Sequence, residues 1–135
     1  MELKFKTKFV EIIADKEKSY IEIIRSTETA RMQENDYKEE AVEWLKIIQS
    51  EKPKFQLVDD RNMKFVINVK LQDWINENLI APAVKASIRK TAFIVTNEIF
   101  SQVSIEQTLD DNKERVLQIN YFENEKDAKD WLFSK

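Results

Sequence analysis

The chain of 135 residues contains no cysteine, no histidine and no glycine. The absence of cysteine excludes disulfides, thiol nucleophiles and thiolate metal sites. The absence of histidine excludes the serine-histidine-aspartate and cysteine-histidine mechanisms, together with zinc sites built on imidazole. The absence of glycine excludes the P-loop and the dinucleotide-binding turn, because both bring backbone without a Cβ atom close to phosphate. Carboxylate, lysine, arginine and hydroxyl chemistry remains, as does binding of hard cations through oxygen.

The charge balance and the hydropathy pattern limit the partners. The chain carries 22 lysines and arginines against 25 acidic residues, a formal net charge of −3, which gives no global attraction to nucleic acid or to an anionic membrane. The longest apolar run, Leu79–Val84, is six residues long, far short of the ~20 that span a bilayer. The amino terminus lacks the apolar stretch of a signal peptide. We therefore expect a cytoplasmic protein without a nucleic-acid partner and without integral membrane contact.

The amino-terminal part has the pattern of extended structure. Apolar residues between Leu3 and Ile13 are interleaved with lysine and glutamate, and a second β-rich run covers Tyr20–Ile24. The all-polar stretch Asp15–Ser19 separates them. Two strands joined by polar residues predict an antiparallel hairpin, and without glycine its loop is expected to be longer than a tight two-residue turn.

The rest of the chain alternates between helical and strand periods. The amphipathic segment Glu34–Glu51 predicts a helix that ends before Pro53, since the residue before a proline avoids the helical region. The uninterrupted apolar run inside Thr91–Thr96 is typical of a parallel strand covered on both faces. The other predicted elements are a strand at Phe55–Val58, a helix capped by Asn68 and irregular near Pro82, a helix capped by Asn97 that carries Ile99, Phe100 and Val103, a strand at Val116–Phe122, and a final helix in which Asn124 and Asp127 form a capping box.

The predicted order is therefore β-β-α-β-α-β-α-β-α over one domain, residues 1–135. Alternating strands and helices predict an α/β fold with a mixed, mostly parallel sheet and flanking helices, in which the leading hairpin adds an antiparallel edge.

Four segments in this order resemble a known family. They are Phe55–Asn62 (FQLVDDRN), Leu71–Trp74 (LQDW), Lys90–Val95 (KTAFIV) and Asp127–Leu132 (DAKDWL). They are similar to the SpoIIAA-like proteins, a STAS-type family of small, mostly uncharacterised bacterial proteins. The resemblance implies a fold like that of the anti-sigma-factor antagonists and, more distantly, of the CRAL-TRIO lipid-transfer domains. Those relatives bind proteins or apolar ligands and are not generally catalysts.

One departure from that family concerns regulation. In the phospho-regulated antagonists a serine or threonine follows the strand that corresponds to Phe55–Val58, at the start of the next helix. This chain has no serine or threonine from Glu51 through Ala86. The resemblance therefore does not carry a phosphorylation switch to this position.

The first candidate binding site is the segment Asp59, Asp60, Arg61 and Asn62. It follows a central strand, and open α/β sheets bind ligands at the carboxyl ends of their strands. The aspartates offer acceptors or ligands for a hard cation, and Arg61 offers an anion clamp. The alternative is structural, with Asp59 accepting bonds from loop N–H groups and Arg61 neutralising its neighbours.

The second candidate is the apolar surface of the helix after Asn68, formed by Leu71, Trp74, Leu79 and Ile80. Ile80 lies off the main apolar stripe, and a helix that is apolar on more than one side requires a second contact. Core packing is the alternative explanation.

The sequence thus predicts a non-enzymatic interaction or regulatory module with no catalytic residue, no metal site and no cofactor. Its expected partner is a protein, with a second copy of the chain in a homodimer as one option. The alternative is a carrier of a small apolar ligand such as a fatty acyl chain, with the Trp74 helix over the cavity. A third hypothesis is a hydrolase that uses Asp59 or Asp60 with a divalent cation.

Overall fold

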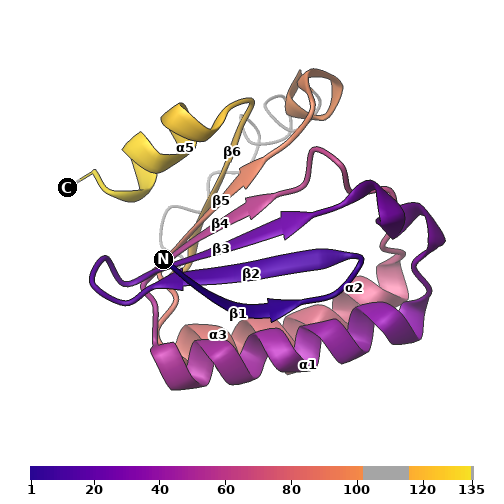
Figure 1. Cartoon of the computed structure of the whole chain (residues 1–135), viewed down its shortest axis with the longest axis horizontal. Coiled ribbons are helices and arrows are strands. Elements are labelled where there is room, and N and C mark those ends of the chain that lie inside the picture. Colours follow the sequence, from indigo (N-terminus) through magenta and orange to yellow (C-terminus); the bar gives the residue numbers. More distant parts are fainter. Residues whose placement is uncertain (102–115, 135) are drawn as a thin grey trace.

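The structure is a computed structural model that describes residues 1–101 and 116–134. Its centre is a six-stranded sheet in which the strands lie side by side in chain order (Figure 1). The strands are β1 (Glu2–Lys6), β2 (Val10–Asp15), β3 (Tyr20–Arg25), β4 (Phe55–Asp59), β5 (Lys90–Ile94) and β6 (Gln118–Phe122).

The pairing of the strands confirms the predicted α/β class and the mixed, mostly parallel sheet. β1, β2 and β3 pair antiparallel, whereas β3–β4, β4–β5 and β5–β6 pair parallel. β5, the strand with the uninterrupted apolar run, lies between two parallel neighbours as predicted. The carboxyl ends of four strands therefore meet at one edge of the sheet.

The predicted antiparallel hairpin across Asp15–Ser19 is confirmed by β2 and β3, but the prediction of a single strand before it was wrong, because the stretch from Leu3 to Ile13 forms two strands. β1 and β2 are joined by a tight turn in which Thr7 N–H donates to the carbonyl of Val10 at 2.9 Å. The Thr7 hydroxyl accepts from Phe9 N–H at 3.1 Å. A threonine side chain thus closes a turn that neither glycine nor proline marks in the sequence.

The long helix α1 (Glu34–Glu51) has the predicted bounds. Lys52 takes the left-handed conformation at its end, with φ 50°, a position that glycine usually occupies. Its N–H donates to the Ile48 carbonyl at 2.8 Å, and Pro53 follows.

The next helical segment is irregular near Pro82, as expected. It consists of α2 (Val69–Ile75), the π-helical turn η2 (Asn76–Ile80) and α3 (Ala81–Ala86). Asn68 caps it by accepting from Leu71 N–H at 2.8 Å. Pro82 has no N–H to donate to the preceding turn, and the wider π-helical turn lies immediately before it.

The carboxyl-terminal helices agree with the prediction except at one cap. Residues 97–101 are helical, and the cap is Thr96 rather than Asn97, because the Thr96 hydroxyl accepts from Ile99 N–H at 3.4 Å. The predicted position Val103 lies outside the described residues. Asn124 caps α5 (Glu125–Leu132) and accepts from Asp127 N–H at 2.9 Å.

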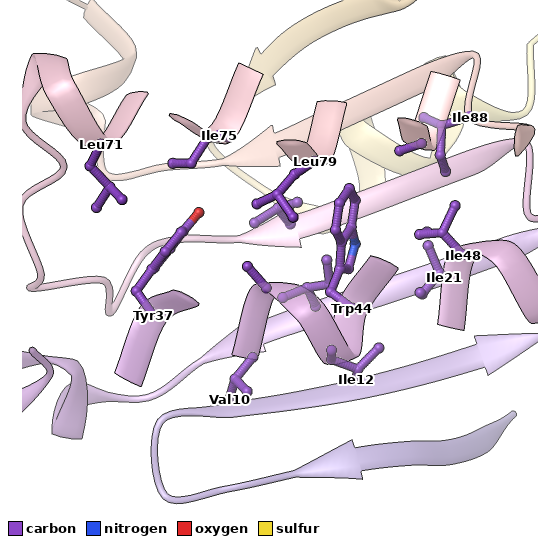
Figure 2. Close-up of a cluster of buried hydrophobic side chains, with 14 of the residues drawn as sticks. Val10, Ile12, Ile21, Tyr37, Trp44, Ile48, Leu71, Ile75, Leu79 and Ile88 are labelled. Carbon is purple, nitrogen blue, oxygen red and sulfur yellow. The ribbon is translucent and has the colours of Figure 1, made fainter. Parts of the chain in front are cut away.

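The helices cover the sheet on two sides. α1, α2 and α3 lie on one face and α5 on the other (Figure 1). The larger core lies between the sheet and α1, where Leu71, Ile75 and Leu79 point towards the α1 side chains Tyr37 and Trp44 (Figure 2). Among the described residues, no helix is both long enough and apolar enough to cross a bilayer.

Candidate functional site

The candidate site lies where β3 and β4 end. Arg25 closes β3 and Asp59 closes β4, and these strands are parallel neighbours. Asp60 extends the pairing of β4, since its N–H donates to the Ile94 carbonyl of β5 at 2.9 Å. The segment Asp59–Asn62 therefore stands at the carboxyl edge of a central strand, where the sequence placed it.

Asp59 is bound by its neighbour Arg61. Its Oδ1 atom accepts from Arg61 Nε at 3.0 Å and from Arg61 N–H at 3.2 Å, and its Oδ2 atom accepts from Arg61 Nη2 at 2.7 Å. Burial alone would raise the pKa of Asp59, but these hydrogen bonds hold it below its usual value. This pairing is the structural alternative that the sequence left open for Asp59 and Arg61.

Asp60 points to the opposite face of the sheet, as successive strand residues do. There its carboxylate faces Arg25, with Asp60 Oδ1 at 3.9 Å from Arg25 Nε. Arg25 also forms an ion pair with Glu40 of α1, and its guanidinium lies over the Tyr37 ring, 5.5 Å from the centroid. One arginine thus serves two carboxylates in a buried cluster formed by Arg25, Tyr37, Glu40 and Asp60.

Some buried polar atoms of the cluster lack a hydrogen bond, and its one cationic side chain faces two carboxylates. Arg25 Nε and Glu40 Oε2 are buried and have no hydrogen-bond partner in the described part of the chain. Burial raises the pKa of Glu40, and Arg25 offsets this only in part. Burial likewise raises the pKa of Asp60 to about 6, against the opposing effect of Arg25. Burial thus raises the pKa of both carboxylates of the cluster, and one arginine opposes it at each.

Sequence reasoning missed Arg25 and Glu40. One signal was present, because Glu40 falls on the apolar stripe of α1 that also carries Tyr37, Ala41 and Trp44. A carboxylate on that stripe must be buried, and a buried carboxylate requires a cation or a hydrogen-bond donor. Nothing in the spacing of the sequence identifies Arg25 as that cation, since 15 positions separate it from Glu40.

Residues 61–70, which we call the edge loop, run from this cluster into the first two residues of α2. The loop is held by the hydroxyl of Thr29, a fully buried side chain in η1 (Thr27–Arg31). That hydroxyl accepts from Lys64 N–H at 2.9 Å, and its single proton is shared between the Ser26 carbonyl at 2.8 Å and the Asn62 carbonyl at 3.1 Å. Asn62, one of the predicted site residues, therefore contacts Thr29 through its backbone carbonyl.

The middle of the edge loop alternates between half-buried and exposed side chains. Met63, Phe65 and Ile67 pack against the core, and Phe65 stacks on Tyr37 with ring centroids 5.7 Å apart. The residues between them point outward, which is the period of extended backbone. Val66 in the loop is 81% exposed and Val69, at the start of α2, is 80% exposed.

The second set of predicted site residues belongs to the core. Leu71 and Leu79 are buried, and Trp74 and Ile80 are half-buried against the same cluster. Lys38 of α1 lies over the Trp74 ring, 5.0 Å from its centroid. Core packing therefore accounts for Leu71 and Leu79, and only parts of Trp74 and Ile80 face outward.

Two of the surface hollows formed by described residues lie away from α2. One, of about 440 Å³, lies at the end of β6 and the start of α5 and is lined by Phe100, Asn120, Tyr121, Phe122, Glu123, Asn124 and Asp127. The other, of about 180 Å³, lies between β1 and α1. Neither includes a residue of the helix that the carrier hypothesis places over a cavity. The cation-dependent hydrolase gains no support either, since no three potential metal ligands lie together in residues 1–101 and 116–134.

Comparison with known proteins adds no further constraint: no family model matches the chain, and no curated protein or solved structure is significantly similar to it.

Proposed function

We propose that the protein is a non-enzymatic, cytoplasmic interaction module of STAS-like fold that recognises a partner protein through the edge loop. The observation that carries this proposal is the exposure of Val66 and Val69, the two most exposed large apolar side chains in the described part of the chain. Covering each against a partner would contribute about 1.5–3 kcal/mol.

The way in which the loop is held supports a role in binding. Thr29 anchors its backbone on one side, and Met63, Phe65 and Ile67 hold it against the core. The exposed valines are thus presented by an ordered segment, which reduces the entropy lost when a partner binds.

The position of the loop agrees with the family resemblance. It directly follows Asp59 and Asp60, in the region where the phospho-regulated antagonists carry their serine or threonine. Because this segment has no hydroxyl residue, we propose constitutive binding without a phosphorylation switch.

Affinity capture with matched variants tests this proposal. A tagged protein bearing Val66→Ser and Val69→Ser is compared with wild type and with Val42→Ser, which changes a valine of α1 that is 43% exposed. We expect wild type and Val42→Ser to retain the same partner and the double variant to lose it. Equal capture by all three proteins would contradict the proposal. Light scattering of the purified proteins decides whether the partner is a second copy, since a dimer would then dissociate in the double variant alone.

A further inference from the structure

The two hydrogen-bonding edges of the edge-loop backbone differ in whether their groups have partners. In extended chain, the N–H and C=O groups of successive residues point to opposite edges. The Asn62 carbonyl and the Lys64 N–H point to the Thr29 hydroxyl, at 3.1 and 2.9 Å. The opposite edge therefore carries the N–H and C=O groups of Phe65 and Ile67.

That second edge has no partner in the described part of the chain. Neither the N–H nor the C=O group of Phe65 or Ile67 forms a hydrogen bond there. Their side chains nevertheless hold the backbone in place, since both pack against the core. The loop thus combines side chains held against the core with backbone N–H and C=O groups at Phe65 and Ile67 that are unpaired within the described residues, and strand addition requires such unpaired groups.

Charge indicates what kind of chain fits this edge. Residues 61–70 contain three basic residues and no acidic one, in a protein whose formal net charge is −3. Arg61 is neutralised by Asp59. Lys64 and Lys70 are exposed and form no ion pair with another described residue, so the surface beside Val66 and Val69 is locally positive.

We propose that the edge loop binds an extended, acidic segment of a partner protein, which adds as a strand along Phe65–Ile67. Apolar side chains of that segment cover Val66 and Val69, and its carboxylates face Lys64 and Lys70. This inference rests on the proposed function and specifies the chemistry of the partner.

Amide hydrogen exchange, read by NMR on isotope-labelled protein, tests this mode with a defined probe. The probe is the hexapeptide Thr-Glu-Thr-Val-Thr-Glu, blocked at both ends, whose glutamate and valine side chains share one face of the strand, as those of Lys64 and Val66 do in the loop. At saturating peptide we expect exchange of the Phe65 and Ile67 amides to slow by about tenfold or more. The amide of Val66, which points to the Thr29 edge, should change much less. A uniform change across residues 64–68, or none, would overturn strand addition.

Two controls separate backbone pairing from charge. The same peptide N-methylated at every residue keeps its charge, has no backbone N–H to donate and carries methyl groups along the edge that would pair, so it should give no protection of Phe65 and Ile67. The protein variant Lys64→Glu with Lys70→Glu should bind the glutamate peptide at least about tenfold more weakly and should gain binding of a lysine-valine peptide. Equal binding of the N-methylated peptide, or charge reversal without effect, would contradict the inference.

The outcomes distinguish this inference from the proposed function. If the Val66→Ser and Val69→Ser variant loses its partner while the peptide protects no amide, the edge loop remains the recognition surface and strand addition is wrong. Sedimentation with phosphatidylserine vesicles tests whether the exposed valines bind a lipid surface instead of a peptide. Vesicle binding that requires Val66 and Val69, without any peptide effect, would replace the acidic segment by a lipid surface.

Discussion

Asp59 and Asp60 follow one another in the chain, yet their carboxylates lie on opposite sides of the sheet and their pKa values move in opposite directions. Arg61 holds the pKa of Asp59 low, whereas burial raises the pKa of Asp60 to about 6. A lowered pKa stabilises the folded protein above the unfolded pKa, and a raised one destabilises it once the group ionises.

Asp60→Asn should therefore change how stability depends on pH. The folded protein binds the Asp60 proton more tightly than the unfolded chain does, so ionisation costs stability as pH rises from about 4 to about 6. The free energy of unfolding of the variant relative to wild type should rise by about 2–3 kcal/mol between pH 4 and pH 7. Urea unfolding of both proteins across this range measures the difference, and a difference that does not vary with pH would contradict the assignment.

Asp59→Asn should act with the opposite sign. The Asp59–Arg61 pair is partly exposed, so we expect the variant to be about 1 kcal/mol less stable than wild type at pH 7. This deficit should shrink as pH falls through the lowered pKa of Asp59, because wild type then loses the same interaction. The same unfolding series provides the measurement. If the two aspartate variants shifted stability in the same direction, the placement of the two carboxylates would be wrong.

Removing one partner of the buried Arg25–Glu40 pair should lower the free energy of unfolding strongly. Replacing both partners with apolar residues should lower it much less. Glu40→Leu leaves the Arg25 charge buried with only Asp60 at 3.9 Å, and we expect a loss of about 3–5 kcal/mol. In an Asp60→Asn background, where Glu40 is the remaining acidic partner of Arg25, combining it with Arg25→Met removes both charges and should restore most of that loss. Chemical denaturation of the two single variants and the double variant at pH 7 gives the coupling free energy. Additive losses would show that the two side chains do not depend on each other.

Thr29→Val should loosen the edge loop without changing the volume of the core. The substitution leaves Lys64 N–H and the Asn62 carbonyl without the hydroxyl that binds both, and should cost about 1–3 kcal/mol. Exchange of the Lys64 amide should become faster. Thr27→Val, at an exposed position of the same turn, is the control and should change stability by less than about 0.5 kcal/mol. An unchanged Lys64 amide would show that Thr29 does not anchor the loop.

The sequence predicted best those elements whose signals are local. The apolar period of α1 and the proline after it determined its bounds, and the uninterrupted run in β5 indicated a strand between parallel neighbours. The turn between β1 and β2 was missed because Thr7 closes it with its side chain. Threonine is also common inside strands, so its presence there gave no turn signal.

The candidate site could be predicted only in part, for the same reason. Asp59 and Asp60 were correctly placed at the end of a strand, but their different surroundings depend on Arg25 and Glu40, which the fold brings in from other elements. In the edge loop, Val66 stands between Phe65 and Ile67, and three consecutive apolar residues do not reveal which one faces outward. That distinction requires the contacts with Tyr37 and Thr29.

Site-specific photocrosslinking in the native cells tests recognition through the edge loop most directly. A photoreactive side chain is placed at Val66 and, in a separate protein, at Val42 of α1, an exposed valine outside the loop. We predict one discrete crosslinked partner from position 66 and none from position 42. The absence of a crosslink from position 66, or the same crosslinked species from both positions, would contradict the account.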